Sequence, residues 1–282
     1  MSFRASTPIN VNRMKCELSK HPDREFVNTF IDGLVNGFDT GVVELPSESY
    51  VCKNLRSCAD HKDFVSTAIA EELESGYLIG PSDTNTCPFP VYRINPIGVV
   101  TGKYSGKKRL ILDLSSPHNS ADHISINELI SKEDYSLTYT RIDDAISIIK
   151  LLGIGSIMNK LDIKDAFKIL PIAPRLWHLH GLQWNGKIYF YTRLVFGCRS
   201  SPKIFTMLSQ AVHYIATNNY GISHLLYLLD DFLTLDRTMI EAERSMALMT
   251  MIFNSLHIPL SHHKTEGPTA VIQYLGIILD SM

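Results

Sequence analysis

Residues Leu226–Leu235 read LYLLDDFLTL, an apolar stretch with two adjacent carboxylates, Asp230 and Asp231, at its centre. The apolar residues are typical of a strand or hairpin arm in a protein interior. Uncompensated charges in such a setting cost several kcal/mol each and are seldom left unpaired. Something that carries positive charge must therefore share this site.

A second acidic segment, KLDIKDAFKIL, begins at residue 160 and places Asp162 at the end of a predicted strand. If the two strands are neighbours in one sheet, Asp162, Asp230 and Asp231 meet at one point. Like carboxylates about 4 Å apart repel by roughly 4 kcal/mol at an effective dielectric near 20, which would raise a pKa or distort the site unless a cation intervenes. Clustered oxygen ligands favour Mg²⁺, with Mn²⁺ as a substitute, over zinc. Two such ions suit in-line phosphoryl transfer. The alternative interpretation is that these are buried acids paired with lysines.

The composition describes a globular protein of one large domain or two interlocked lobes, with 282 residues, 45% hydrophobic and 20% charged. Its five cysteines are odd in number and form no CxxC pair, which argues against a disulfide framework and favours a reducing compartment. No signal peptide or membrane span is visible, so we expect an intracellular protein, cytoplasmic or nuclear or both. The net charge of −2 means that any nucleic-acid site must be a local patch.

Several secondary-structure elements can be predicted from local signals. Two short strands, VV (99–100) and RLILDLS (109–115), are predicted around a turn at Gly106, with four basic residues at and near its tip. A solvated loop is the simplest interpretation of these charges. A helix is predicted from the N-cap Thr140 to the stop at Gly153. Asn185-Gly186 predicts a two-residue hairpin turn. Further helices are predicted over residues 202–217 and 236–256.

The order of motifs resembles that of a reverse transcriptase. After the basic hairpin come LDIKDAF (161–167), LVFGCRSSPKIF (194–205), YLLDDFL (227–233), HHKTEGP (262–268) and YLGIILD (274–280). The resemblance is closest to the DIRS group of tyrosine-recombinase retrotransposons, whose polymerases carry segments similar to NPIGVV, RLILDLS, DIKDAF and LLDDFL. It covers most of the chain, including residues 9–34.

This resemblance implies an α+β fold, the fingers and palm of a right-hand polymerase, with an antiparallel palm sheet packed on helices. The implied domains are an N-terminal helical arm (1–80), fingers (81–126 and 170–201) and palm (127–169 and 202–282). The chain is expected to stop before the thumb. In an intact element a thumb, a ribonuclease H and a recombinase domain would follow downstream.

The resemblance also implies the roles of individual residues. Asp162, Asp230 and Asp231 would be the catalytic, metal-binding aspartates, and Lys264 would protonate the leaving pyrophosphate. Six residues would bind the incoming nucleotide and its template partner: Lys103, Arg109, Asp165, Ala166, Phe167 and Gly197.

Each of these six residues has its own expected contact. Lys103 and Arg109 would neutralise the triphosphate, and Asp165 and Ala166 would lie against the triphosphate and the sugar. The Phe167 ring would crowd the sugar 2′ carbon. Gly197 would let the backbone approach the template–nucleotide pair.

Two positions depart from the common reverse transcriptase pattern. Leu228 stands where many of these enzymes have tyrosine, and Phe196 stands where they often have glutamine. Contacts usually made by that glutamine side chain cannot be transferred to this chain.

The implied function is that of an RNA-directed DNA polymerase, which adds dNTPs to a primer on an RNA or DNA template and uses two Mg²⁺ ions. Another template-dependent polymerase, such as an RNA polymerase, is an alternative against which Phe167 argues. A third alternative is a catalytically inactive, nucleic-acid-binding remnant.

Overall fold

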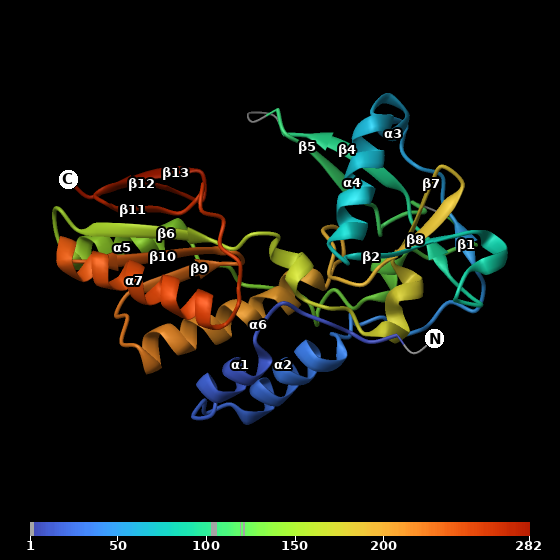
Figure 1. Ribbon diagram of the computed structural model, residues 1–282. Helices are drawn as coiled ribbons and strands as arrows, with labels where there is room; N and C mark the ends of the chain where they lie inside the picture. Colours follow the sequence, from blue (N-terminus) through green and yellow to red (C-terminus); the bar gives the residue numbers. More distant parts are fainter. Residues whose placement is uncertain (1–2, 103–105, 119, 121) are drawn as a thin grey trace. The chain divides into compact units, whose positions relative to one another are not determined.

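The computed structural model describes residues 3–102, 106–118, 120 and 122–282 (Figure 1). The chain divides into two compact units. Unit 1 comprises the residues up to Thr7, Asp32–Ser136 and Leu170–Ser201, and unit 2 comprises Pro8–Ile31, Leu137–Ile169 and Pro202–Met282. The boundary between Ile31 and Asp32 falls inside helix α2 (Arg24–Asn36), so the two units share this helix.

Unit 1 is built on a five-stranded sheet in the order β1-β3-β7-β8-β2 and on a separate pair, β4 and β5. Its strands are β1 (Tyr50–Val51), β2 (Leu78–Ser82), β3 (Arg93–Ile94), β4 (Ile97–Thr101), β5 (Lys108–Leu112), β7 (Gly181–Trp184) and β8 (Lys187–Tyr191). Its helical segments are α3 (Arg56–Asp60), α4 (Lys62–Glu74), η1 (Thr84–Thr86), η2 (Ile126–Leu129) and η4 (Pro174–Leu179).

Both hairpins predicted in this unit are confirmed. Strands β4 and β5 are antiparallel, with Val100 opposite Arg109, while the turn residues 103–105 lie outside the described part of the chain. In the other hairpin Trp184 pairs with Lys187. Asn185 and Gly186 between them have φ of 48° and 77°, the positive values that this two-residue turn requires.

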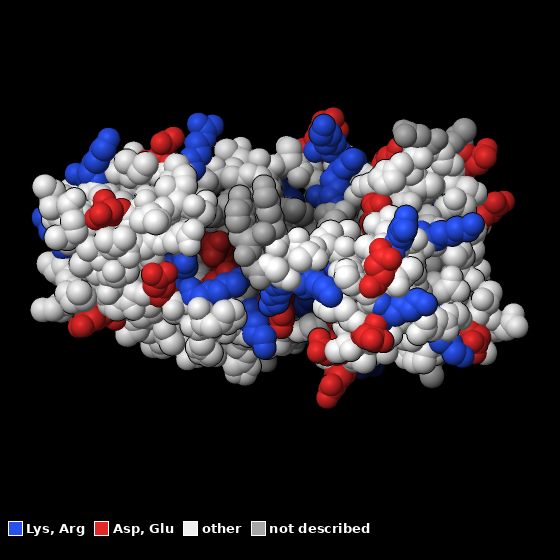
Figure 2. All heavy atoms as spheres, turned by 90° about the horizontal axis from the view of Figure 1, so that it is seen from above, with Lys and Arg blue, Asp and Glu red and all other residues white. Residues whose placement is uncertain are grey.

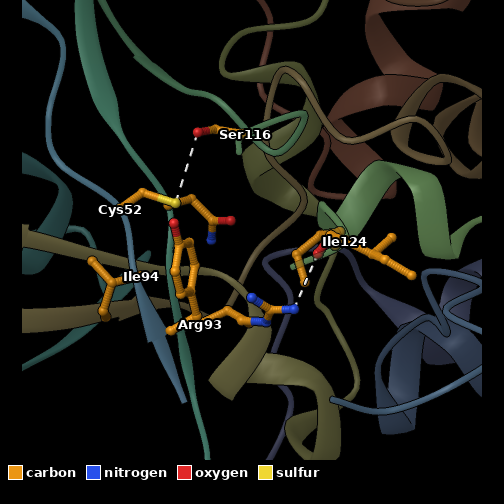
Figure 3. Close-up of a pocket in the computed structure, with 8 residues that line it drawn as sticks. Cys52, Arg93, Ile94, Ser116 and Ile124 are labelled. Atoms are coloured by element: carbon orange, nitrogen blue, oxygen red, sulfur yellow. Dashed lines mark hydrogen bonds between the residues drawn. The ribbon is translucent and has the colours of Figure 1, made fainter. Parts of the chain in front are cut away.

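A buried arginine ties together three segments of unit 1 (Figure 3). Arg93 is 8% exposed, donates a hydrogen bond from Nη2 to the carbonyl oxygen of Ile124, and lies 5.5 Å from the Tyr50 ring centroid. Burial lowers the pKa of Arg93. Nearby, Ser116 Oγ lies 3.7 Å from Cys52 Sγ. This part of unit 1 is therefore held by polar contacts as well as by apolar packing.

Unit 2 is built on a four-stranded antiparallel sheet in the order β11-β6-β10-β9. Its strands are β6 (Ile157–Asp162), β9 (Leu225–Leu228), β10 (Asp231–Asp236) and β11 (Glu266–Thr269), with the hairpin β12 (Val271–Tyr274) and β13 (Ile277–Asp280) beside them. Its helical segments are α1 (Val11–Glu17), α5 (Ile142–Leu152), η3 (Ala166–Ile169), α6 (Ser201–Tyr214), η5 (Ile215–Asn219) and α7 (Met239–Ser255).

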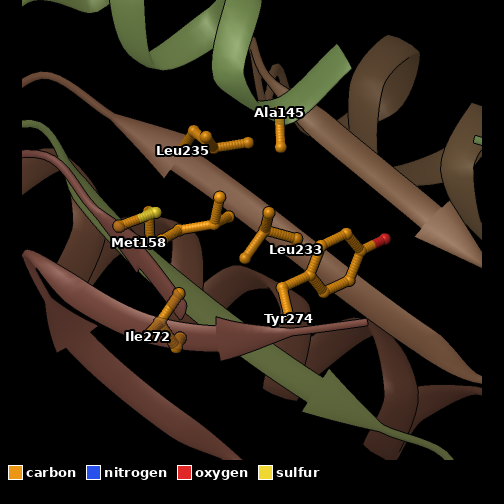
Figure 4. Close-up of a cluster of buried hydrophobic side chains, with 7 residues drawn as sticks. Ala145, Met158, Leu233, Leu235, Ile272 and Tyr274 are labelled. Atoms are coloured by element: carbon orange, nitrogen blue, oxygen red, sulfur yellow. The ribbon is translucent and has the colours of Figure 1, made fainter. Parts of the chain in front are cut away.

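The two faces of this sheet carry different contacts because strand side chains alternate. On one face Met158, Leu233 and Leu235 pack with Ala145 of α5 and Tyr274 of β12 in a buried cluster (Figure 4). The α+β class, with an antiparallel sheet packed on helices, is confirmed.

The opposite face is covered by α7. Asn159 Nδ2 donates to the Ala242 carbonyl oxygen, and the Phe232 ring meets Phe253 edge-on at 5.3 Å. The sheet is thus covered by α5 and β12 on one face and by α7 on the other.

The helix starts differ in detail from the predicted ones. Arg141, not Thr140, is the N-cap of α5, because the Asp144 carboxylate accepts from the Arg141 N–H while the Thr140 hydroxyl donates to Tyr227. Helix α7 begins at Met239 rather than at Asp236, which ends strand β10. Thr238 caps α7 with Glu241 in a capping box.

The surface mixes both signs of charge. Lysine and arginine side chains are interspersed with acidic ones over the face seen in Figure 2, in keeping with the net charge of −2. Across the described ranges, no helix has both the length and the apolar composition that a membrane span requires.

Candidate active site

The LYLLDDFLTL stretch is a complete hairpin rather than one arm of a hairpin. Leu228 at the end of β9 pairs with Asp231 at the start of β10, so Leu229 and Asp230 form a two-residue turn between them. Leu229 has φ of 53°, a left-handed conformation that a branched apolar residue adopts only where its surroundings hold it.

Two hydrogen bonds hold this strained turn. The Ser209 hydroxyl of α6 donates to the Leu229 carbonyl oxygen at 2.7 Å, and the Ile163 N–H donates to the Asp230 carbonyl oxygen at 3.0 Å. Ser209 is fully buried, and its role was not predicted from the sequence. A hydroxyl residue among apolar neighbours such as Leu208 and Ala211 was the available signal.

The structure brings Asp162 and Asp231 together. Strands β6 and β10 are antiparallel neighbours in which these two residues lie directly opposite each other, so their side chains share one face. Asp162 is 4% exposed, and the two carboxyl groups are within hydrogen-bonding reach. Burial, followed by the charges of Asp230 and Asp162, raises the pKa of Asp231 to about 7. Negative charge is therefore in excess at this end of the sheet.

Lys264 is the cation that meets this excess charge. Its Nζ lies 3.0 Å from both carboxylate oxygens of Asp162. The lysine side chain is 51% exposed, whereas that of Asp162 is 5% exposed. The sequence left two interpretations of Asp162, a metal ligand and an acid paired with a lysine. Asp162 has the lysine partner of the second interpretation, and the first interpretation concerns the same carboxylate.

A cavity of about 430 Å³ opens on these groups, with Asp162, Asp231, His263, Lys264 and Glu266 in its lining. Lys160 also lines it. Its ammonium donates to the Gln273 carbonyl oxygen at 2.7 Å and lies 3.4 Å from Glu266. Lys160 is therefore engaged away from the aspartates.

The donor set fits a hard divalent cation. Carboxylate oxygens of two opposed aspartates converge, and an ammonium already occupies a position where a cation contacts both oxygens of Asp162. As the side chains stand, no group of three or more His, Cys, Asp or Glu residues in the described part of the chain is arranged to hold a metal ion.

The nucleotide-site candidates of unit 2 follow β6 directly. Asp165 is exposed and has φ of 53°, and its carbonyl oxygen accepts from the Lys168 N–H at 2.8 Å. Ala166 and Phe167, at the start of η3, are buried at 6% and 4% exposure. The Phe167 ring meets the Phe205 ring of α6 edge-on at 5.4 Å. Phe167 therefore has a packing role whether or not it contacts a sugar.

The remaining candidates belong to unit 1. Arg109 lies exposed on β5, and Lys103 is outside the described residues. Gly197 has φ of 97°, and a Cβ there would lie 2.6 Å from the Leu112 carbonyl oxygen. Its own carbonyl oxygen accepts from Asn127 Nδ2 at 2.8 Å. Glycine at this position is required by the packing of unit 1 itself.

In this antiparallel sheet Asp162 ends one central strand and Asp231 begins the other, so two carboxylates face each other beside a strained hairpin turn. This is the architecture of a polymerase palm. It defines the class of protein as a template-dependent nucleic-acid polymerase.

Comparisons with known proteins identify the family. A family profile described as "Reverse transcriptase (RNA-dependent DNA polymerase)" matches residues 93–279, more than half of the chain. The chain belongs to this family and carries a reverse transcriptase core, that of a nucleotidyltransferase. The Pro-Pol polyprotein of Simian foamy virus type 1 is 28% identical over 146 residues, which are 51% of this chain and 11% of the polyprotein.

Solved structures share the fold. The foamy viral protease-reverse transcriptase dRH in complex with double-stranded DNA superimposes with a TM-score of 0.62 at 17% identity, over 100% of this chain and 48% of that one. Native prototype foamy virus protease-reverse transcriptase gives 0.59 at 18% identity, over 99% of this chain and 36% of that one. The chain thus spans less than half of these proteins. These relatives are viral, and the DIRS affiliation is not confirmed by them.

Proposed function

We propose that this chain catalyses RNA-directed DNA synthesis, adding dNTPs to the 3′ end of a primer paired with an RNA or DNA template. The observation that carries the proposal is the pair formed by Asp162, which is buried, and Asp231, which is partly exposed, opposed across β6 and β10 with excess negative charge. A foamy viral protease-reverse transcriptase has been solved in complex with an RNA/DNA hybrid, which supports such a substrate here.

Asp162, Asp230 and Asp231 would hold two Mg²⁺ ions, or Mn²⁺ as a substitute. When bound, such ions activate the primer 3′ hydroxyl and offset the charge of the departing pyrophosphate. The contribution of the protein is to fix the carboxylates. The hydrogen bonds from Ser209 and Ile163 hold the turn that carries Asp230, and strand pairing holds Asp231 against Asp162.

Other residues would bind and select the nucleotide. We assign Lys264 the proton that pyrophosphate takes on leaving, Phe167 the exclusion of a 2′ hydroxyl, and Asp165 and Ala166 contacts with triphosphate and sugar. Arg109, with Lys103 in the same hairpin, would neutralise the triphosphate. Gly197 would leave room for the base pair.

We further propose that unit 1 contains the fingers and unit 2 the palm. The fingers would then include residues 81–126 and 170–201, and the palm residues 127–169 and 202–282, with 1–80 as an N-terminal arm; residues 127–136 of this palm fall in unit 1. All five cysteines are free in the structure, which supports action inside the cell, in cytoplasm or nucleus.

The motif spellings support an origin in a DIRS-type element, in which thumb, ribonuclease H and recombinase domains follow the polymerase core. Sequencing the DNA downstream of this coding region tests the affiliation. A tyrosine-recombinase reading frame is expected, whereas a retroviral-type integrase would contradict it.

Primer extension with the purified chain tests the activity. A labelled DNA primer on an RNA template should lengthen with dNTPs and Mg²⁺, and Asp162→Asn should abolish the reaction. Asp143→Asn is the matched control, because Asp143 lies in the first turn of α5 and does not line the cavity at Asp162 and Asp231. Equal extension by wild type and Asp162→Asn would refute the assignment. No observation on the described residues favours the alternative of an inactive remnant.

A further inference from the structure

The contact between Lys264 and Asp162 has the geometry of a cation site filled from within the chain. One ammonium group is equidistant, at 3.0 Å, from the two oxygens of a nearly buried carboxylate. Such charge-assisted contacts are short and strong, and the carboxylate would be costly to leave unpaired.

Backbone hydrogen bonds fix the loop that carries Lys264, whereas the lysine side chain is half exposed. The Ser261 N–H donates to the Asp162 carbonyl oxygen at 2.8 Å, and the N–H groups of Lys264 and Thr265 both donate to the Ser261 carbonyl oxygen. The backbone is thus docked on the end of β6. The lysine side chain is half exposed and borders the 430 Å³ cavity, so it has room to move without the loop.

We propose that Lys264 serves as a built-in placeholder cation, which neutralises Asp162 in the metal-free protein, lowers the affinity of the site for divalent metal, and is released when metal binds. This inference rests on the proposed function, because it assumes that Asp162 is a metal ligand. A divalent ion on the Asp162 oxygens would lie within a few ångströms of the ammonium, and the two like charges would repel.

One consequence concerns the order in which the metal binds and Lys264 becomes available. The lysine expected to serve the leaving pyrophosphate is held on Asp162 until the metal displaces it into the cavity. Metal binding would therefore both complete the carboxylate site and free Lys264 to act, so the two events are coupled.

Mn²⁺ binding to the full chain, measured by electron paramagnetic resonance without nucleotide, tests the proposal. Lys264→Met should tighten Mn²⁺ binding by about fivefold, which corresponds to about 1 kcal/mol. Lys264→Arg, which keeps a cation, should stay within about twofold of wild type. The matched control is Lys160→Met, which removes the same charge from the same cavity without touching Asp162, and it should also change the affinity by less than about twofold.

Thermal unfolding supplies a second readout. In EDTA, Lys264→Met should unfold at a lower temperature than wild type, because Asp162 loses its partner, and saturating Mn²⁺ should stabilise the variant by more than it stabilises wild type. Unchanged or weaker Mn²⁺ binding by Lys264→Met would overturn the proposal, as would equal effects of Lys264→Met and Lys160→Met.

Two further measurements separate this inference from the proposed function. Asp162→Asn should abolish tight Mn²⁺ binding, and wild-type primer extension reports the activity itself. If the wild type extends primers while Lys264→Met binds Mn²⁺ as wild type does, only the placeholder role fails. If the wild type neither extends primers nor binds Mn²⁺, both fail.

Discussion

Replacing Gly197 with alanine tests the tightest backbone approach in unit 1. The new Cβ would meet two obstacles, a φ of 97° and the Leu112 carbonyl oxygen at 2.6 Å. Gly186→Ala is the matched control, because Gly186 has φ of 77° and nothing within 4 Å of the position of a Cβ. Both residues belong to unit 1, so the difference between the variants isolates the contact with Leu112.

The expected loss of stability can be built from these two obstacles. A non-glycine residue in the left-handed region costs about 1–2 kcal/mol, which both variants lose. Forcing neighbouring atoms apart in a packed site costs about 1–3 kcal/mol more. We therefore expect Gly186→Ala to lower the free energy of unfolding by about 1–2 kcal/mol, and Gly197→Ala by about 2–5 kcal/mol.

Urea unfolding followed by tryptophan fluorescence measures this difference. Both tryptophans, Trp177 and Trp184, lie in unit 1, so the signal reports the unit that carries both substitutions. If Gly197→Ala loses no more stability than Gly186→Ala, the contact with Leu112 does not explain the glycine, and the reasoning from backbone packing is wrong.

Three further predictions concern pH, sugar choice and nucleic-acid affinity. His180 is fully buried, and burial lowers its pKa to about 4. Since the unfolded chain binds a proton near pH 6.5, stability should fall by up to about 3 kcal/mol between pH 6.5 and 4. His180→Asn should flatten this dependence in acid unfolding measurements, and an unchanged profile would contradict the prediction. Phe167→Val should admit ribonucleotides in primer extension, whereas Phe205→Leu, which disturbs the same ring contact, should not; equal ribonucleotide use would make Phe167 a core residue alone. Finally, the chain should bind primer–template weakly and with a shallow dependence on salt, because its net charge of −2 leaves few phosphate contacts; long products at physiological salt with excess competitor template would refute this.

The sequence predicted those features that depend on local pattern. Asn185-Gly186 predicted its hairpin because the residues themselves favour positive φ. The meeting of Asp162, Asp230 and Asp231 was expected on the condition that their strands pair. Antiparallel pairing meets that condition and sets Asp231 opposite Asp162, while Asp230 lies in the adjoining turn. The reverse transcriptase family was evident from the order of motifs and is confirmed by the family profile.

Features that depend on tertiary contacts escaped the sequence. LYLLDDFLTL has no glycine or asparagine to mark a turn, and Leu229 adopts positive φ because Ser209, on a helix that begins 28 residues earlier in the chain, holds its carbonyl oxygen. His178 and His180 have the two-residue spacing of side chains on one strand face, but they belong to the 3₁₀ segment η4 and its C-cap. In each case the tertiary surroundings outweigh the local preference.

The answer to the charge problem posed by Asp230 and Asp231 also lay beyond the sequence. The residue pattern allowed either a divalent metal or a lysine as the compensating cation. Only the docking of Ser261 on the end of β6 decides that Lys264, 102 residues after Asp162, reaches both of its oxygens while Lys160, two residues before it, does not. The Lys264 side chain is half exposed, so the displacement by a divalent ion that we propose would not require a buried ammonium to leave its partner.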